Sequence, residues 1–186
     1  MTPQFSDTLI INGIEKPLRS NPLEDFFTLF PPRPNFIRFG SFCRRGYVAT
    51  WEVKENQLML TGIGKPWVCS VPQRHRTEQG MASCSHDHNG PCYSRYVTVS
   101  DLMPTVNGEA VAAWYTGTLE VPHGEMTLYI HNDYASHYER YLLVDVEYGQ
   151  VTEIRIVGNE ERQSTLKKER LDMPAAETET WWERWV

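Results

Sequence analysis

Residues 46–63, GYVATWEVKENQLMLTGI, decide the fold class of this chain. Every second residue of the first half is apolar, namely Tyr47, Ala49, Trp51 and Val53. Successive side chains of a β-strand point to opposite faces of a sheet, so this alternation predicts a strand with one buried face. Glu55-Asn56 predicts a turn, and residues 57–63 predict the strand that returns from it. The stretch therefore predicts a β-hairpin.

A shorter strand and a helix are predicted before this hairpin. Residues 8–11 are an apolar run that ends at Asn12-Gly13, a pair that tolerates the positive φ of tight hairpin turns. Residues 23–30 follow Asn21-Pro22 and carry apolar side chains at helical spacing. The proline-rich run at 31–34 ends this helix, because proline cannot donate a backbone hydrogen bond to the helix.

Four more strands are predicted downstream, over residues 112–121, 125–131, 138–147 and 151–157. Pro122-His123-Gly124 and Tyr148-Gly149-Gln150 are expected to form turns between them. Strands that follow one another through short turns favour a mainly β fold. The prediction is an antiparallel meander that forms a sandwich or a strongly curved sheet, with one short helix.

The chain is expected to form one β-rich domain over residues 1–158, with a long Cys/His-rich loop inserted at 64–92. A charged, Trp-rich C-terminal tail follows at 159–186. Leaving Trp181, Trp182 and Trp185 in water would be costly, so we expect this tail to dock on the domain or on a partner.

The composition restricts the partner and the compartment. The 186 residues carry a formal net charge of -6, which argues against nucleic-acid binding because phosphate recognition needs clustered Lys and Arg. The longest apolar runs fall far short of the ~20 residues of a membrane span, and the first residues lack the features of a secretory signal. We therefore expect a cytoplasmic protein with no membrane partner, in which cysteines are thiols or metal ligands more often than disulfides.

The inserted loop carries an unusual concentration of metal-ligand side chains. Thiolate and imidazole are the preferred ligands of zinc, which takes four of them tetrahedrally. Binding one ion would also offset the entropy lost in ordering so long a loop. Four protein ligands would make the zinc structural. The predicted metal ligands come from the set Cys69, Cys84, His86, His88 and Cys92.

Other interpretations of this loop stay open. His75 is a weaker candidate ligand, and Asp87 could orient a ligating histidine. A disulfide could join Cys84 to Cys92, or either of them to Cys69. The third interpretation is a solvated loop with free thiols, since the spacing matches no standard zinc-finger pattern.

A second concentration of polar residues lies at 131–140, HNDYASHYER, between two predicted strands. An enzyme could use His131, Asp133, His137 or Glu139 there as acid–base groups or metal ligands, which would make the chain a metal-assisted hydrolase. The other interpretation is a polar hairpin loop, and we expect these side chains to satisfy backbone groups or to face solvent separately.

Cys43 precedes Arg44-Arg45 in the sequence. Two adjacent guanidinium groups could lower the pKa of a thiol and make it reactive. A buried structural cysteine at the entrance of a strand is the interpretation that we favour.

Three segments together resemble a family of small, functionally uncharacterised bacterial proteins. They are RGYVATWEV at 45–53, WYTGTL at 114–119, and the segment from Gly124 to Arg140 with His131, Tyr134 and Tyr138. The likeness covers most of residues 8–157 and excludes the inserted loop and the tail. It implies no reaction, but compact acidic proteins of this kind sometimes serve as immunity proteins that neutralise bacterial toxins.

The sequence thus predicts a non-enzymatic protein-binding domain with a structural zinc loop. The partner is expected to be a protein, plausibly a toxin. The alternative is the hydrolase that uses the His131–Glu139 loop.

Overall fold

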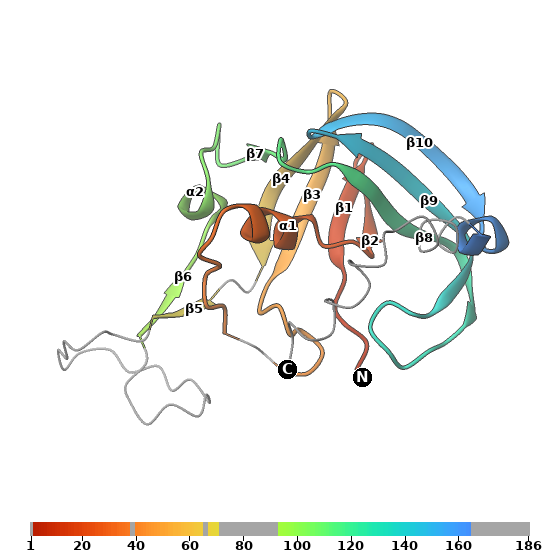
Figure 1. Cartoon of the computed structure of the whole chain (residues 1–186), viewed down its shortest axis with the longest axis horizontal. Helices are drawn as coiled ribbons and strands as arrows, with labels where there is room; N and C mark the ends of the chain where they lie inside the picture. The colour runs from red at the N-terminus through yellow and green to blue at the C-terminus, as the bar shows by residue number, and fades with distance from the viewer. Residues whose placement is uncertain (1, 38–39, 65–66, 71–92, 165–186) are drawn as a thin grey trace, which may run out of the picture.

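The computed structural model describes residues 2–37, 40–64, 67–70 and 93–164, with the backbone alone for 67–70 and 93–95. Most strands belong to one sheet in the order β2-β1-β3-β4-β10-β9-β8, with β7 on β4, and β5 pairs with β6 separately (Figure 1). The strands are β1 (Asp7–Ile11), β2 (Ile14–Leu18), β3 (Val48–Lys54), β4 (Gln57–Gly64), β5 (Trp67–Ser70), β6 (Tyr93–Tyr96), β7 (Ala110–Val111), β8 (Gly117–Leu128), β9 (His137–Glu147) and β10 (Gln150–Gly158). The helices are α1 (Pro22–Leu29), α2 (Val99–Leu102) and a further helix over 159–164.

The mainly β prediction is confirmed, and the hairpin of residues 46–63 forms as expected from β3 and β4. Its turn places Glu55 and Asn56 at φ 49° and 60°, the left-handed conformation that tight hairpin turns require. Tyr47, Ala49 and Trp51 are fully buried on one face. The predicted alternation therefore marks the core side of β3.

The sheet is antiparallel except at one place. β1 and β2 form a hairpin through Asn12-Gly13, and β1 then lies parallel to β3, with Leu9 opposite Trp51. A parallel pair needs a long crossover, and the connection through α1 supplies it. The meander expected from the sequence is therefore interrupted between β2 and β3.

The turn predicted at Pro122-His123-Gly124 is wrong. β8 continues through these residues to Leu128, and the pairing with β9 shifts register between His123 and Met126. Gly124 adopts φ 83°, so the positive-φ residue makes a bulge and not a reversal. The predicted strand at 112–121 also begins later, at Gly117.

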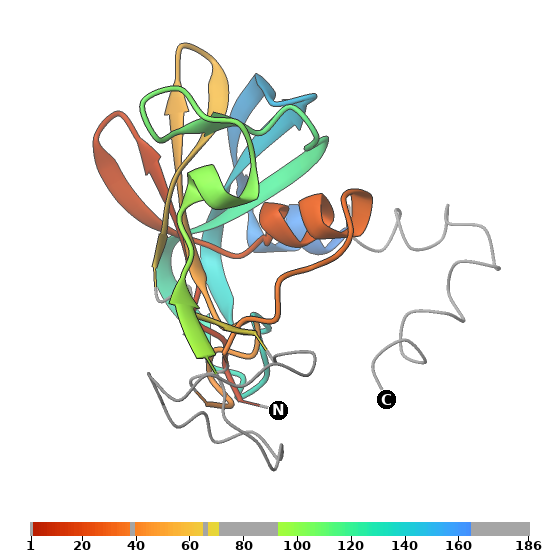
Figure 2. The ribbon, with the colours of Figure 1, turned by 90° about the vertical axis from the view of Figure 1, so that its left-hand side faces the viewer.

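The core lies between the curved sheet and α1, which crosses the concave side (Figures 1 and 2). Leu23 and Phe27 of the helix are buried against the sheet, whereas Phe30 is exposed. The helical spacing places Leu23, Phe26, Phe27 and Phe30 on one face, of which the structure buries the first and third, while Phe26 packs at the margin of the core.

β10 separates from the rest of the sheet soon after it begins. It pairs with β4 only at Gln150, opposite Gln57. Because the two strands are antiparallel, β10 continues from Gln150 past the Glu55-Asn56 turn that precedes β4, and its later residues lie beyond the end of β4 (Figure 1). Met59 and Leu60 lie on the other side of this pair, where β4 pairs with β7.

The segment after β10 starts with the helix over 159–164, where the sequence predicts a tail without apolar period. Arg162 donates to Glu120 Oε2 at 2.6 Å, and its guanidinium lies 4.3 Å from the ring centre of Tyr141. The three tail tryptophans lie outside the described residues. In the part of the chain that the structure describes, no helix has the length and apolarity of a membrane span.

Candidate functional site

A buried carboxyl group lies at the start of β1, on the core side of the sheet. Asp7 is in phase with Leu9, and both side chains are buried. The Asp7 carboxylate accepts hydrogen bonds from Ala49 N at 2.9 Å and from Trp51 Nε1 at 3.3 Å. Arg45 donates to the same group from Nη2 at 3.0 Å. Asp7 therefore fixes β1, β3 and the loop before β3 to one another.

Burial raises the pKa of Asp7 to about 6, because the charged form loses its hydration, and Arg45 opposes this shift. For Arg45, burial acts to lower the pKa, but Asp7 and Tyr134 outweigh it and the pKa is raised overall. At neutral pH the pair is therefore ionised. A buried ion pair of this kind depends on its hydrogen bonds, because desolvation offsets much of the attraction.

Tyr134 connects the ion pair to the distant β8–β9 connection. Its hydroxyl accepts from Arg45 Nη1 at 2.8 Å and lies 3.0 Å from Phe5 O and 3.2 Å from Asn21 Oδ1. Burial raises the pKa of Tyr134, so the hydroxyl keeps its proton. One side chain thus joins the loop after β8 to the N-terminal segment and the start of α1.

Arg19 holds the same loop from the other side. It donates to Tyr134 O at 2.7 Å and to the Tyr138 hydroxyl at 3.0 Å, and its guanidinium lies 4.8 Å from the ring centre of Tyr138. Ser136 is buried, and its hydroxyl lies 3.0 Å from Ile130 N and 3.2 Å from Ile130 O. We name Asp7, Arg45, Tyr134 and Arg19 the anchoring cluster, because together they fix the position of this loop.

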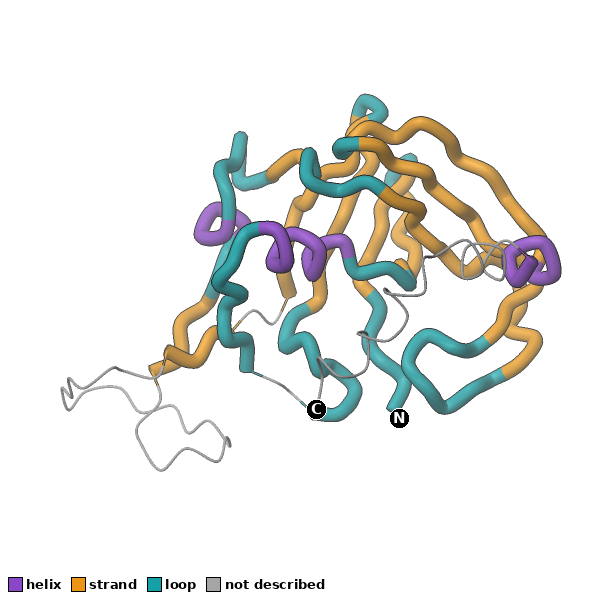
Figure 3. The backbone as a smooth tube through the Cα atoms, in the orientation of Figure 1, coloured by secondary structure: helices purple, strands orange, loops and turns teal. Residues whose placement is uncertain are grey.

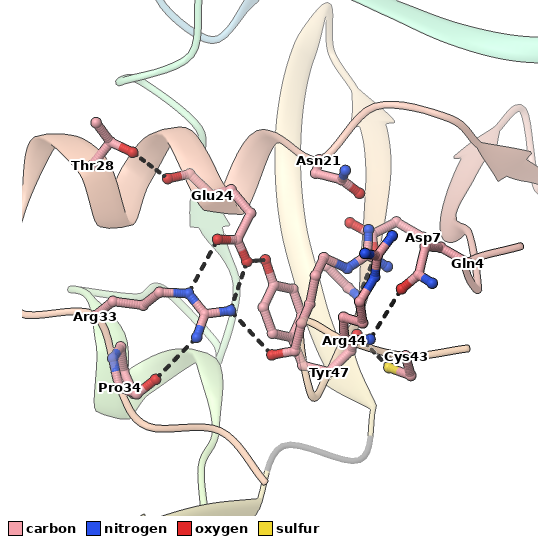
Figure 4. Close-up of polar contacts among 12 residues, drawn as sticks. Gln4, Asp7, Asn21, Glu24, Thr28, Arg33, Pro34, Cys43, Arg44 and Tyr47 are labelled. Carbon is pink, nitrogen blue, oxygen red and sulfur yellow. Dashed lines mark hydrogen bonds and ion pairs between the residues drawn. The ribbon is translucent and has the colours of Figure 1, made fainter. Parts of the chain in front are cut away.

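A second set of polar contacts extends the cluster beneath α1 (Figure 4). Glu24 points from the helix toward Arg33, which binds it through Nε at 3.1 Å and Nη2 at 2.9 Å. The buried Tyr47 donates its hydroxyl to Glu24 Oε1 at 2.7 Å. Burial, together with the charges of Glu24 and Asp7, raises the pKa of Tyr47, so it remains a donor. These contacts hold α1 against the sheet.

The loop that the anchoring cluster fixes carries exposed apolar side chains at its entrance. We name residues 126–137 the β8–β9 end; it is the long connection at the lower right of Figure 3. Met126, Leu128 and Tyr129 are 48%, 50% and 59% exposed. Three large apolar side chains thus face solvent within four residues, on a backbone that is held in place. Such a surface can bind another macromolecule without reorganising.

The structure separates the acid–base candidates of the 131–140 segment. His131 Nδ1 lies 2.9 Å from the Tyr129 hydroxyl, and Glu139 accepts from Glu125 N at 3.1 Å. Asp133 is exposed, at a positive φ of 42°. Within the described ranges, no three His, Cys, Asp or Glu side chains come close enough to hold a metal ion. The hydrolase alternative stays a prediction.

The predicted zinc ligands lie almost entirely outside the described residues. Cys84, His86, His88, Cys92 and the weaker candidate His75 fall in the range 71–92. Of Cys69 the structure describes the backbone, which lies in β5 opposite Ser94 of β6. The zinc site therefore stays a prediction.

Cys43 is buried and unpaired, as the sequence interpretation favoured. Its Sγ donates to Tyr47 O at 3.4 Å. Of the two arginines beside it, Arg45 binds Asp7 and not the thiol. The sequence analysis weighed Arg45 only as a neighbour of Cys43 and missed the anchoring cluster. The available signal was Asp7 itself, a charged residue in phase with the apolar Leu9 and Ile11.

The fold and the site define a class of protein: a mainly β domain whose curved sheet is closed by one helix and tied by a buried Asp–Arg pair. No family model, no curated protein and no solved structure matches the chain. The resemblance to small bacterial proteins therefore stays a prediction.

Proposed function

We propose that this chain is a non-enzymatic protein-binding domain that recognises its partner through the β8–β9 end. The observation that carries the proposal is the exposure of Met126, Leu128 and Tyr129 on a loop whose backbone the anchoring cluster holds. Interfaces draw most of their energy from a few central side chains, and a preformed backbone reduces the entropy lost on binding. Both conditions are met at this end of the molecule.

The charge of the chain favours a basic partner. The formal net charge is -6, and the acidic Glu125, Asp133 and Glu139 lie on or beside the β8–β9 end. Complementary charge at the rim of an interface speeds association and selects among partners. A basic protein with an apolar depression fits this surface. A toxin neutralised by the chain is the partner that the family resemblance suggests.

A structural zinc in the inserted loop is part of the same proposal. The backbones of β5 and β6 pair with Ser70 opposite Tyr93, so the two ends of the loop lie side by side. Cys69 and Cys92 each adjoin this closing pair in the sequence. Because its two ends are already held together, the loop loses less entropy when distant ligands are brought to one ion.

The binding proposal is tested with two triple variants. The first, Met126→Ser/Leu128→Ser/Tyr129→Ser, removes the apolar side chains of the β8–β9 end. The matched control, Ile14→Ser/Val106→Ser/Tyr148→Ser, removes three apolar side chains that are at least as exposed, from a hairpin, a loop and a turn elsewhere. The tagged chain is expressed in its native cells, the captured protein is identified and purified, and its affinity is measured by titration calorimetry.

We expect the wild type and the control to bind alike, and the β8–β9 variant to bind at least about a hundredfold more weakly, as loss of central side chains does. The proposal is contradicted if both variants bind the partner equally well. It is also contradicted if the chain captures no protein that binds it after purification.

Elemental analysis of chelator-free protein tests the zinc separately. We expect about one zinc per chain, lost in Cys84→Ser and Cys92→Ser. Zinc-free protein of unchanged thermal stability would exclude a structural role.

A further inference from the structure

β10 combines an unpaired edge with an uncovered apolar face. From Thr152 to Gly158, β9 is the only strand that pairs with it in the part of the chain that the structure describes. Ile154 and Ile156 lie opposite Val144 and Leu142, on the core side of the sheet. Val144 is fully buried, but Ile154 and Ile156 are 46% and 53% exposed. The core side of the sheet therefore reaches solvent at β10.

The free edge presents the backbone groups of Ile154 and Ile156. Val151 N donates to Asn56 O, so the backbone of Val151 faces away from β9. The register shift between Val151 and Glu153 inserts one extra residue, which reverses the alternation beyond it. In an antiparallel ladder, backbone groups turn outward at every second residue. Beyond the shift these are residues 154 and 156.

β2 and β8 are the terminal strands of the sheet order, and they are protected in a way that β10 is not. β2 carries Pro17, which cannot donate a hydrogen bond to a neighbouring strand. Its end is also bonded to β8, because Arg19 N donates to Glu120 O at 2.8 Å. The β10 segment 152–158 contains no proline and exposes two isoleucines. An edge of this kind favours pairing with another strand.

We infer that β10 pairs with β10 of a second copy of this chain, antiparallel, around a twofold axis at Ile154. This register places Glu153 of each copy opposite Arg155 of the other, so two opposite-charge pairs form on the outer face. On the core face, Ile154 lies opposite Ile154 of the second copy. The sheets of both copies become continuous, and the four exposed isoleucines are covered.

The alternatives to this register are less favourable. A twofold axis at Arg155 or at Glu153 sets identical charges opposite each other, which destabilises a strand pair. An axis at Ile156 leaves Arg155 opposite Val157 and forms no charge pair. Of the centres from 153 to 156, Ile154 is the one that sets opposite charges against each other.

Arg155 belongs to a charged row on the outer face. Its guanidinium binds Asp145 on β9 and lies 3.1 Å from Glu153 Oε2. Asp145 is itself held by the hydroxyl of Thr118 at 2.5 Å. A guanidinium has five N–H donors, so Arg155 can keep these partners and also donate to Glu153 of a second copy.

The test uses two charge reversals at the proposed contact. Glu153→Arg gives a chain with arginine at both positions, and Arg155→Glu gives a chain with glutamate at both. Each variant repels its own copies, but a mixture restores two opposite-charge pairs in every heterodimer. Sedimentation velocity measures association of the wild type, each variant and the mixture, in a dilution series reaching about 1 mM, where weak interfaces still associate. Thermal unfolding confirms that each variant folds, and Glu15→Arg on β2 is the matched control.

We expect a concentration-dependent dimer for the wild type and for Glu15→Arg. Each β10 variant alone should dimerise at least about tenfold more weakly, and the mixture should recover the wild-type affinity. A wild type that stays monomeric over the whole series overturns the inference. So does a mixture no stronger than its components. If the wild type is monomeric but its β10 amides resist hydrogen exchange, another segment of the chain covers the edge, and the dimer is excluded.

Discussion

β4 and β10 are strands of similar length and similar alternation, but one is fully integrated in the sheet and the other is not. Leu58 and Leu60 of β4 are fully buried, whereas Ile154 and Ile156 of β10 are about half exposed on the same side of the sheet. β4 has β3 on one edge and β10 and β7 on the other. Among the strands of the described ranges, β10 has β9 alone as a partner beyond its first residues. Burial thus depends on the neighbours of a strand as much as on its own pattern.

The difference has a local cause. Gln150 pairs with Gln57, the first residue of β4, and Val151 N donates to Asn56 O in the turn before it. Because the two strands are antiparallel, the rest of β10 runs past the end of β4. β7 covers β4 farther along, at Met59 and Leu60. We call the half of the sheet that contains β1, β3 and β4 the closed side, and the free edge of β10 the open side.

The largest effect is expected on the closed side, where no water can replace a lost partner. Asp7→Ala removes the acceptor of Ala49 N and Trp51 Nε1 and leaves the Arg45 charge without its carboxylate. We expect the free energy of unfolding to fall by about 3–5 kcal/mol, measured by chemical denaturation. A loss below about 1 kcal/mol would show that the anchoring cluster is open to solvent.

A direct comparison of the two strands follows from Leu60→Ala and Ile154→Ala. Leu60 is fully buried on β4, so its truncation leaves a cavity and should cost about 3 kcal/mol. Ile154→Ala on β10, measured at low concentration where the chain is monomeric, should cost no more than about 1 kcal/mol. Equal losses in the two variants would mean that β10 is covered in solution.

The pH dependence of stability should also separate the two sides. The pKa of Asp7 rises from 3.8 to about 6 on folding because the carboxyl is buried, with Arg45 opposing and Glu24 adding to the shift. Between pH 4 and pH 6 the folded chain therefore holds this proton more tightly than the unfolded chain. Stability from this group is complete below about pH 4 and decreases as pH rises through 6, by about 2–3 kcal/mol.

The control for this pH dependence is Asp7→Asn, which keeps the size of the side chain and cannot titrate. Thermal unfolding from pH 4 to pH 7 should show a smaller decrease in this variant than in the wild type. Parallel profiles would indicate that the folded pKa of Asp7 is not raised.

The smallest stability effect is expected at the β8–β9 end. Met126→Ser, Leu128→Ser and Tyr129→Ser each remove a side chain that is about half exposed, so each should change the free energy of unfolding by less than about 1 kcal/mol. Tyr134→Phe removes a hydroxyl with three partners and should cost about 1–3 kcal/mol. If the three serine variants cost more than Tyr134→Phe, the β8–β9 end is part of the core and not a binding surface.

The sequence by itself determined most of the strands, because alternation and turn chemistry are local. Spacing alone predicts the hairpin at 46–63, the helix near 23–30 and the strands β9 and β10. The residue types at Asn12-Gly13 and Glu55-Asn56 predict the two turns. The turn predicted from residue types at Pro122-His123-Gly124 is wrong, because these residues form a bulge inside β8. A glycine at positive φ fits both a turn and a bulge, and only the partner strand distinguishes them.

Tertiary structure alone decided which residues meet. Asp7 and Arg45 are 38 positions apart and Arg45 and Tyr134 are 89 apart, so no local pattern relates them. The parallel pairing of β1 with β3 brings Asp7 beside Ala49 and Trp51, and the return of the chain after β8 brings Tyr134 onto the pair. The same holds for Ile154 and Ile156, which lie opposite Val144 and Leu142 on the core side of the sheet but stay about half exposed. Side-chain spacing fixes the face of a strand, whereas burial and polar contacts depend on what the rest of the chain sets against that face.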